Sequence, residues 1–123
     1  MNQPSPATAP NHNLAREAAR LTLTKRAEDV VILDLRALDG VCDFFVIATG
    51  NSEVQVRAIA DAVEEGLRES RGIKPWHSEG FEARRWILLD YVDVVVHVFH
   101  ARAREYYLLD KLWGDAARED VAD

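Results

Sequence analysis

The sequence predicts an α+β domain in which a mixed β-sheet is flanked by helices. The fifteen residues from Arg85 to Phe99, RWILLDYVDVVVHVF, hold two apolar runs around a short polar segment, which is typical of a β-hairpin. A hairpin cannot bury both faces alone, so a larger sheet is required. Phe44 to Ala48 is a continuous apolar run, which indicates a strand of that sheet buried on both faces.

The first third of the chain predicts a tail, a helix and a strand. Residues 1–12 hold three of the four prolines among small polar residues, which favours a disordered tail. Asn13 is a candidate N-cap for a helix that runs to about Arg26. Val30 to Leu35 is a β-branched run of strand length, and Asp39-Gly40 marks a turn after it.

The clearest helix signal follows the buried strand. Ser52 with Gln55 forms a capping-box pattern, and Gly72 is a typical C-terminal stop. Five apolar residues between these ends recur at helical spacing: Val56, Ile59, Ala60, Val63 and Leu67.

The rest of the chain predicts a link, the hairpin and a last helix. Ile73 to Arg84 looks irregular, and Ala101 to Trp113 has helical periodicity ended by Gly114. Residues 115–123 are expected to form a short acidic tail. The predicted order is α-β-β-α-β-β-α in a single domain over residues 13–114, without repeats.

The hairpin carries the candidate functional residues. Alternation along its second strand places Val94, Val96 and Val98 on a core face, with Val95, His97 and Phe99 on the other. We expect function on the His97 face. The rings of Trp86 and Tyr91 flank the polar turn, where amphipathic rings serve as interface anchors.

Composition restricts the classes of partner and compartment. The chain has 123 residues, 48% of them hydrophobic, with a net charge of −6 and a pI of about 5.2. That acidity argues against direct nucleic-acid binding and is compatible with a basic protein partner. One cysteine, Cys42, indicates a reducing cytosol. No apolar run approaches a membrane span of about 20 residues, and residues 1–13 do not resemble a signal or transit peptide.

Catalytic and metal sites are weakly supported. Asp34, Asp43, Asp90 and Asp93 lie in or beside strands, as in metal-dependent nucleotidyltransferases, but no D-x-D pair stands within a strand. Cys42 with His77, His97 and His100 matches no zinc spacing, and Cys42 is expected to be a small buried thiol. Gly50-Asn51-Ser52 at a strand-to-helix junction can hold an anion, although a plain helix cap is favoured. We therefore expect no metal and no cofactor.

Several separated motifs resemble the ribosomal silencing factor family, also called Iojap-like, from about Leu14 to Asp115. These motifs are DFFVIATGNS (43–52), QVRAIADAVEEGL (55–67), Glu79-Gly80, WILLDYVDVVVHVF (86–99) and REYYLLDKLW (104–113). Their order and spacing are those of the family, which is a far more specific signal than any single motif.

The resemblance implies a non-enzymatic regulator of translation. Members have a nucleotidyltransferase-like fold without the catalytic carboxylates, and are often homodimeric when free. They bind a large-subunit ribosomal protein on the subunit-joining face, universal protein fourteen, and block association with the small subunit when nutrients are short. Six hairpin residues are implied in partner binding: Trp86, Asp90, Tyr91, Asp93, Val95 and His97.

Two residues depart from the family pattern. Val92 replaces the glycine of the usual DYGD-type turn, and a valine adopts a left-handed conformation less easily than glycine. Cys42 stands where a hydroxyl residue is usual. The alternative function is a divalent-metal-dependent nucleotidyltransferase or nucleotide-binding domain that uses Asp90 and Asp93.

Overall fold

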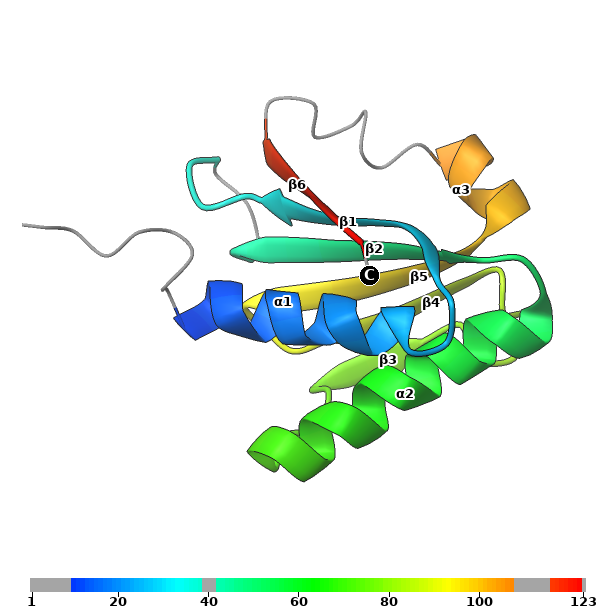
Figure 1. Cartoon of the computed structure of the whole chain (residues 1–123), viewed down its shortest axis with the longest axis horizontal. Helices are drawn as coiled ribbons and strands as arrows, with labels where there is room; N and C mark the ends of the chain where they lie inside the picture. Colours follow the sequence, from blue (N-terminus) through cyan, green and yellow to red (C-terminus); the bar gives the residue numbers. More distant parts are fainter. Residues whose placement is uncertain (1–9, 39–41, 108–115, 123) are drawn as a thin grey trace, which may run out of the picture.

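A six-stranded mixed sheet organises the computed structural model, which describes residues 10–38, 42–107 and 116–122 (Figure 1). Its strands are β1 (Glu28–Asp34), β2 (Phe44–Gly50), β3 (His77–Glu79), β4 (Trp86–Asp90), β5 (Val94–His100) and β6 (Ala117–Val121). The strand order is β3-β4-β5-β2-β1-β6, in which β2 and β5 are parallel and the other neighbours antiparallel. The predicted α+β class with a mixed sheet is confirmed.

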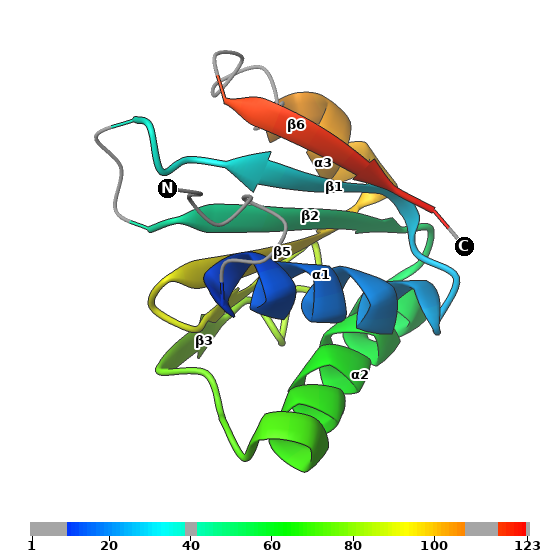
Figure 2. The same cartoon turned by 60° about the vertical axis from the view of Figure 1, so that its left-hand side comes forward.

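The helices lie on both sides of this sheet. They are α1 (Pro10–Leu23), α2 (Glu53–Arg71) and α3 (Ala101–Tyr107). Apolar residues of α1 and α2 share one core with the sheet. Figure 2 shows the two helices in front of the sheet. Ala103 of α3 packs into a second cluster with Phe45 and Phe99. Of the helix predicted over 101–113, residues 108–113 lie outside the described part, as does Gly114.

Strand β2 is the centre of the sheet, as its sequence predicts. All seven of its residues are buried, and its register pairs Phe44 with Val94 and Gly50 with His100 on β5. A strand made almost only of apolar residues is stable in the centre of the sheet because helices and other side chains cover both of its faces.

The predicted limits of α2 are confirmed by its caps. The Ser52 hydroxyl accepts a hydrogen bond from Gln55 N–H at 3.0 Å, while Gln55 Oε1 accepts from Asn51 N–H at 2.7 Å. At the other end Gly72 has φ 67° and its N–H donates to the Arg68 carbonyl. The five apolar residues predicted for the buried face are all fully buried.

Helix α1 begins at Pro10, three residues before the predicted N-cap Asn13. Proline suits the first helical position because its missing N–H would have no intrahelical partner there. Asn11 Nδ2 donates to Asp43 Oδ2 at 2.9 Å, and His12 is buried. The tail predicted over residues 1–12 is therefore wrong for residues 10–12, while residues 1–9 lie outside the described part.

The predicted acidic tail over residues 115–123 is also wrong, because residues 117–121 form edge strand β6 against β1. The strand is not recognisable from the sequence because AREDV is mostly charged and has no alternation of apolar and polar residues. Glu119 lies 2.8 Å from His12 Nε2 and accepts from Arg16 Nε at 3.0 Å. These contacts tie the strand to α1.

The link predicted over residues 73–84 contains a further strand, β3, at the opposite edge of the sheet. All three residues of β3 are exposed, so no alternation of apolar and polar residues marks them. The strand forms because the edge of β4 supplies backbone partners, with His77 opposite Asp90 and Glu79 opposite Leu88.

Candidate functional site

The predicted hairpin is present as β4 and β5, and its register decides which side chains meet. Three cross-strand pairs lie on the side of the sheet away from α1 and α2: Trp86–Phe99, Leu88–His97 and Asp90–Val95. We call these six side chains the hairpin face. Opposed residues of an antiparallel pair point to the same side, so β4 contributes every second residue of WILLD.

Trp86 and His97 form the centre of the hairpin face. The indole Nε1–H of Trp86 donates to His97 Nδ1 at 3.0 Å, and the Trp86 ring stacks on Phe99 with 4.9 Å between centroids. His97 is 3% exposed and contacts Phe45 edge-on at 4.5 Å. Burial lowers the pKa of His97 to about 4. The imidazole is therefore neutral near pH 7, with a bare Nδ1 that holds the indole in place.

The six predicted binding residues differ in accessibility. Trp86 and Asp90 are half-buried, and Asp93 in the turn is exposed. Val95 and His97 lie on the predicted face but are buried beneath its surface.

Tyr91 is 9% exposed and belongs to the core beneath α1 and α2, where burial raises the pKa of its hydroxyl. The expectation that Tyr91 offers an accessible ring is wrong, because it follows Asp90 and points to the opposite side of the sheet.

The turn of the hairpin is strained at Val92. Val92 has φ 75°, and Asp93 N–H donates to the Tyr91 carbonyl at 3.0 Å. This pattern of a positive φ with a bond across two residues is the rare γ-turn. Asp90 Oδ1 accepts a hydrogen bond from Val92 N–H at 2.7 Å, which stabilises the turn conformation. Val92, which stands where the resemblance predicts glycine, thus occupies a position whose positive φ favours glycine.

Replacing Val92 with glycine should raise the free energy of unfolding by about 1 kcal/mol, because the left-handed penalty of a side chain is removed and only partly offset by greater unfolded-state freedom. Val92 is 57% exposed, so little packing is lost. Urea unfolding measures the change. As a control, Val54→Gly at a 74% exposed helical position should destabilise the protein. Equal effects at the two sites would contradict a strained turn.

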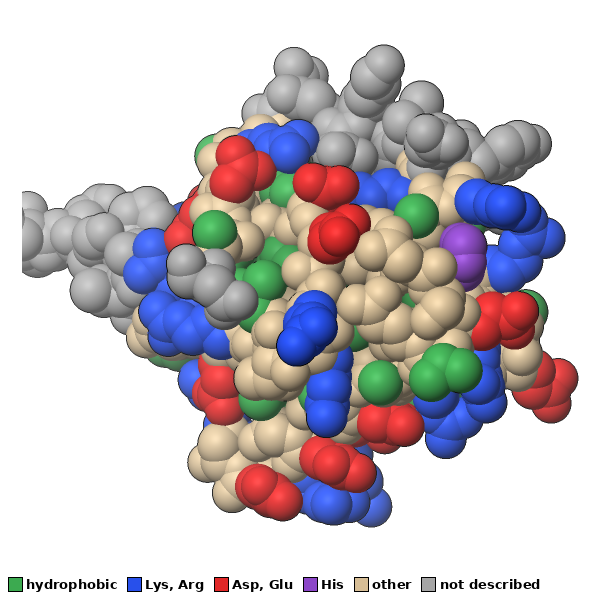
Figure 3. Space-filling view, turned by 45° about the vertical axis from the view of Figure 1, so that its right-hand side comes forward, with side chains coloured by type: hydrophobic (Ala, Val, Ile, Leu, Met, Phe, Trp, Pro, Cys, Tyr) green, Lys and Arg blue, Asp and Glu red, His purple; other side chains and the backbone are tan. Residues whose placement is uncertain are grey.

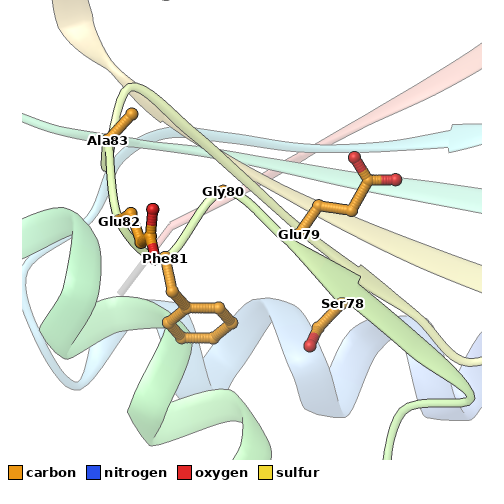
Figure 4. Close-up of a pocket in the computed structure, with 6 residues that line it drawn as sticks. All are labelled: Ser78, Glu79, Gly80, Phe81, Glu82 and Ala83. Atoms are coloured by element: carbon orange, nitrogen blue, oxygen red, sulfur yellow. The ribbon is translucent and has the colours of Figure 1, made fainter.

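The loop before β4 positions Trp86 through Gly80. Gly80 has φ 89°, and a side-chain carbon added to it would lie 2.0 Å from the Trp86 carbonyl oxygen. Figure 4 shows the shallow depression that this loop forms, with Phe81 and Glu79 pointing in different directions. The Phe81 ring lies under Arg57 of α2, whose guanidinium carbon is 4.9 Å from its centroid. The loop is thus packed between β4 and α2.

Sequence reasoning missed three residues of this surface. Leu88 is half-buried between Trp86 and Asp90 on the hairpin face. His77 and Glu79 of β3 oppose Asp90 and Leu88, so they continue the same side of the sheet. The alternation of WILLD could have identified Leu88, whereas β3 carries no such signal.

The other candidate sites have structural explanations. Ser52 is engaged in capping α2, as the plain-cap interpretation holds. Cys42 is buried as predicted, and burial raises its thiol pKa to about 11, so the thiolate is scarce at neutral pH. Within the described ranges, no group of three or more His, Cys, Asp or Glu side chains could hold a metal. In the same part of the chain, no helix has the length and apolarity to cross a membrane.

Acidic and basic side chains are interspersed on the side of the molecule that Figure 3 shows, where no broad basic patch is visible. A nucleic-acid interface of the usual kind gathers Lys and Arg on one face. The described side chains visible in this view do not show that arrangement.

Comparisons with known proteins agree on one family. The family model described as ribosomal silencing factor during starvation matches residues 6–123. A ribosomal silencing factor RsfS from Bacillus subtilis is 46% identical over 109 residues, covering 89% of this chain and 92% of the relative. A mitochondrial Iojap-related protein of Arabidopsis thaliana is 30% identical over 112 residues, covering 87% of this chain and 60% of the relative.

Solved structures carry the same fold. A crystal structure from Chromobacterium violaceum superposes with a TM-score of 0.79 at 32% identity, covering 90% of this chain and 92% of that one. A second, from Bacillus halodurans, has a TM-score of 0.76 at 42% identity, covering 92% and 100%. By sequence over nearly its whole length and by fold, the chain belongs to the ribosomal silencing factor family.

Proposed function

We propose that this protein binds the large ribosomal subunit and blocks its association with the small subunit, which represses translation when nutrients are limiting. The proposed partner is a ribosomal protein on the subunit-joining face. Family membership supports this proposal, since the B. subtilis relative is named a ribosomal silencing factor. A cytoplasmic location would follow from such a partner.

The main support for the proposed contact site is the half-buried indole of Trp86. Its Nε1–H donates to Nδ1 of the buried, neutral His97 at 3.0 Å. A ring fixed in one orientation loses little conformational entropy on binding, which is the property of an interface anchor. Asp90 lies on the same face and Asp93 in the adjoining turn, where both can meet cations of a basic ribosomal protein.

The six predicted residues are proposed to act in three ways. Trp86, Asp90 and Asp93 are accessible and contact the partner. Val95 and His97 support them from below, and Tyr91 anchors the hairpin to the core on the helix side.

Trp86→Ala should weaken binding to purified large subunits by about 30-fold or more, the effect of losing ~2 kcal/mol at an aromatic hot spot. Co-sedimentation at increasing protein concentration measures the affinity, and circular dichroism verifies that the variant is folded. Val54→Ala, which removes an exposed apolar side chain on α2, is the matched control and should bind normally.

Subunit joining supplies the second measurement. Wild-type protein added before small subunits should reduce the yield of joined ribosomes on a sucrose gradient, and Trp86→Ala should not. A folded Trp86→Ala that binds as tightly as wild type would exclude the hairpin face from the interface.

We also propose that the domain is not an enzyme, although its fold is expected to be nucleotidyltransferase-like. Asp90 ends β4 and Asp93 follows across the turn, so the two carboxylates do not form a D-x-D pair on one strand. In the free state a homodimer is proposed from the family resemblance, and sedimentation of the isolated protein would test it.

A further inference from the structure

Trp76 is an exposed tryptophan that the hairpin face does not include. It directly precedes β3, and 78% of its surface is accessible. Its peptide N–H donates to the Asp90 carbonyl at 2.8 Å, so its backbone is fixed beside the end of β4. The hydrogen bond thus orders the segment while the indole packs against little of the domain.

The surroundings of Trp76 join it to the proposed binding surface. Its ring centroid lies 6.1 Å from that of His77, and His77 Nε2 lies 2.8 Å from Glu79 Oε1. The register of β3 on β4 places the side chains of His77 and Glu79 on the same side of the sheet as Leu88 and Asp90. Glu79 and Asp90 therefore lie on the side of the sheet that carries the hairpin face, and the Trp76 indole lies next to His77 at the start of β3. We call these residues the strip.

We propose that Trp76, with the carboxylates of Glu79 and Asp90, is a second anchor point that receives an arginine or lysine of the ribosomal partner. This inference rests on the proposed function and names the chemistry recognised at that surface. A guanidinium or ammonium group is attracted to the face of an indole, and carboxylates beside it satisfy its N–H donors.

Charge favours a basic partner over a second copy of this chain at this strip. The protein carries a net charge of −6, and Glu79 and Asp90 would face like charges if two copies met here. Strand β3 has only three residues, and short edge strands give little backbone pairing to a neighbouring sheet.

Large-subunit binding by Trp76 variants tests the inference. Trp76→Ala should weaken co-sedimentation about tenfold, Trp76→Phe should keep part of the affinity because a ring is retained, and Trp76→Lys should bind worst because it repels the cation. Glu79→Gln should flatten the dependence of binding on salt concentration. The melting temperature of each Trp76 variant should equal that of wild type, because the side chain is exposed.

The outcomes separate this inference from the proposed function. If Trp86→Ala loses binding and Trp76→Ala does not, the second anchor is overturned while the proposed function stands. If both variants bind as tightly as wild type, neither the hairpin face nor Trp76 belongs to the interface with the large subunit. If Trp76→Ala dissociates a homodimer in sedimentation without weakening large-subunit binding, the occupant is a second copy and the inference is overturned.

Discussion

Gly80→Ala should reduce the free energy of unfolding by about 3 kcal/mol or more, because a strained backbone and a steric clash act together. The added carbon would lie 2.0 Å from the Trp86 carbonyl oxygen, and that oxygen belongs to strand β4 rather than to a flexible side chain. The loop or the strand must therefore move. Since Trp86 starts β4, the same substitution should also weaken large-subunit binding in whatever fraction stays folded.

A matched control separates the clash from the backbone strain. Gly72 also has a positive φ, 67°, but a side-chain carbon there would meet nothing within 4 Å. Gly72→Ala should therefore lose only about 1 kcal/mol, the left-handed penalty alone. Urea denaturation of both variants measures the difference. Equal losses would mean that the loop relaxes freely and does not fix Trp86.

Acidification from pH 6.5 to pH 5 should destabilise the protein through His97. Its pKa is about 4 in the folded state, because burial disfavours the charged imidazole, and about 6.5 when unfolded. The unfolded chain thus binds more protons than the folded protein between these pH values. The contribution of neutral, buried His97 to the free energy of unfolding is therefore fully present well above pH 6.5 and decreases as the pH falls. At 1.36 kcal/mol per pH unit, the loss reaches about 2 kcal/mol at pH 5.

The measurement compares the wild type with His97→Phe, which keeps a ring among Phe45 and Phe99 but cannot take up a proton. Titration of other groups, including Glu64, whose pKa is raised by burial and by Asp61, largely cancels in the difference. The variant should be less stable at pH 7, because Trp86 loses its acceptor, yet show a shallower pH dependence. Parallel curves would show that His97 titrates normally and is not buried as described.

Elements whose signals are local could be predicted from the sequence. The capping residues Ser52, Gln55 and Gly72 act within one turn of α2, so their spacing identifies both ends of that helix. The buried run of β2 and the two strands of the hairpin are likewise apolar because they fill the centre of the sheet. Alternation in β5 correctly divided Val96 from His97.

Edge strands were missed because their stabilisation is not local. Strand β6, AREDV, is polar, and it forms because β1 offers backbone partners and His12 and Arg16 meet Glu119 from α1. Strand β3 similarly depends on the free edge of β4. A window of sequence contains neither of these distant partners.

For the candidate site, the sequence alone determined the hairpin, the shared face of Val95, His97 and Phe99, and the family that the motifs indicate, while the register added Trp86 and Asp90 to that face. Only the tertiary structure decided how deep each side chain lies, since burial depends on what packs against the sheet from distant segments. It placed Tyr91 under the helices and joined Trp86 to His97 across the pair of strands. It also left Trp76 exposed beside them, because a backbone hydrogen bond to Asp90 holds the segment without enclosing the ring.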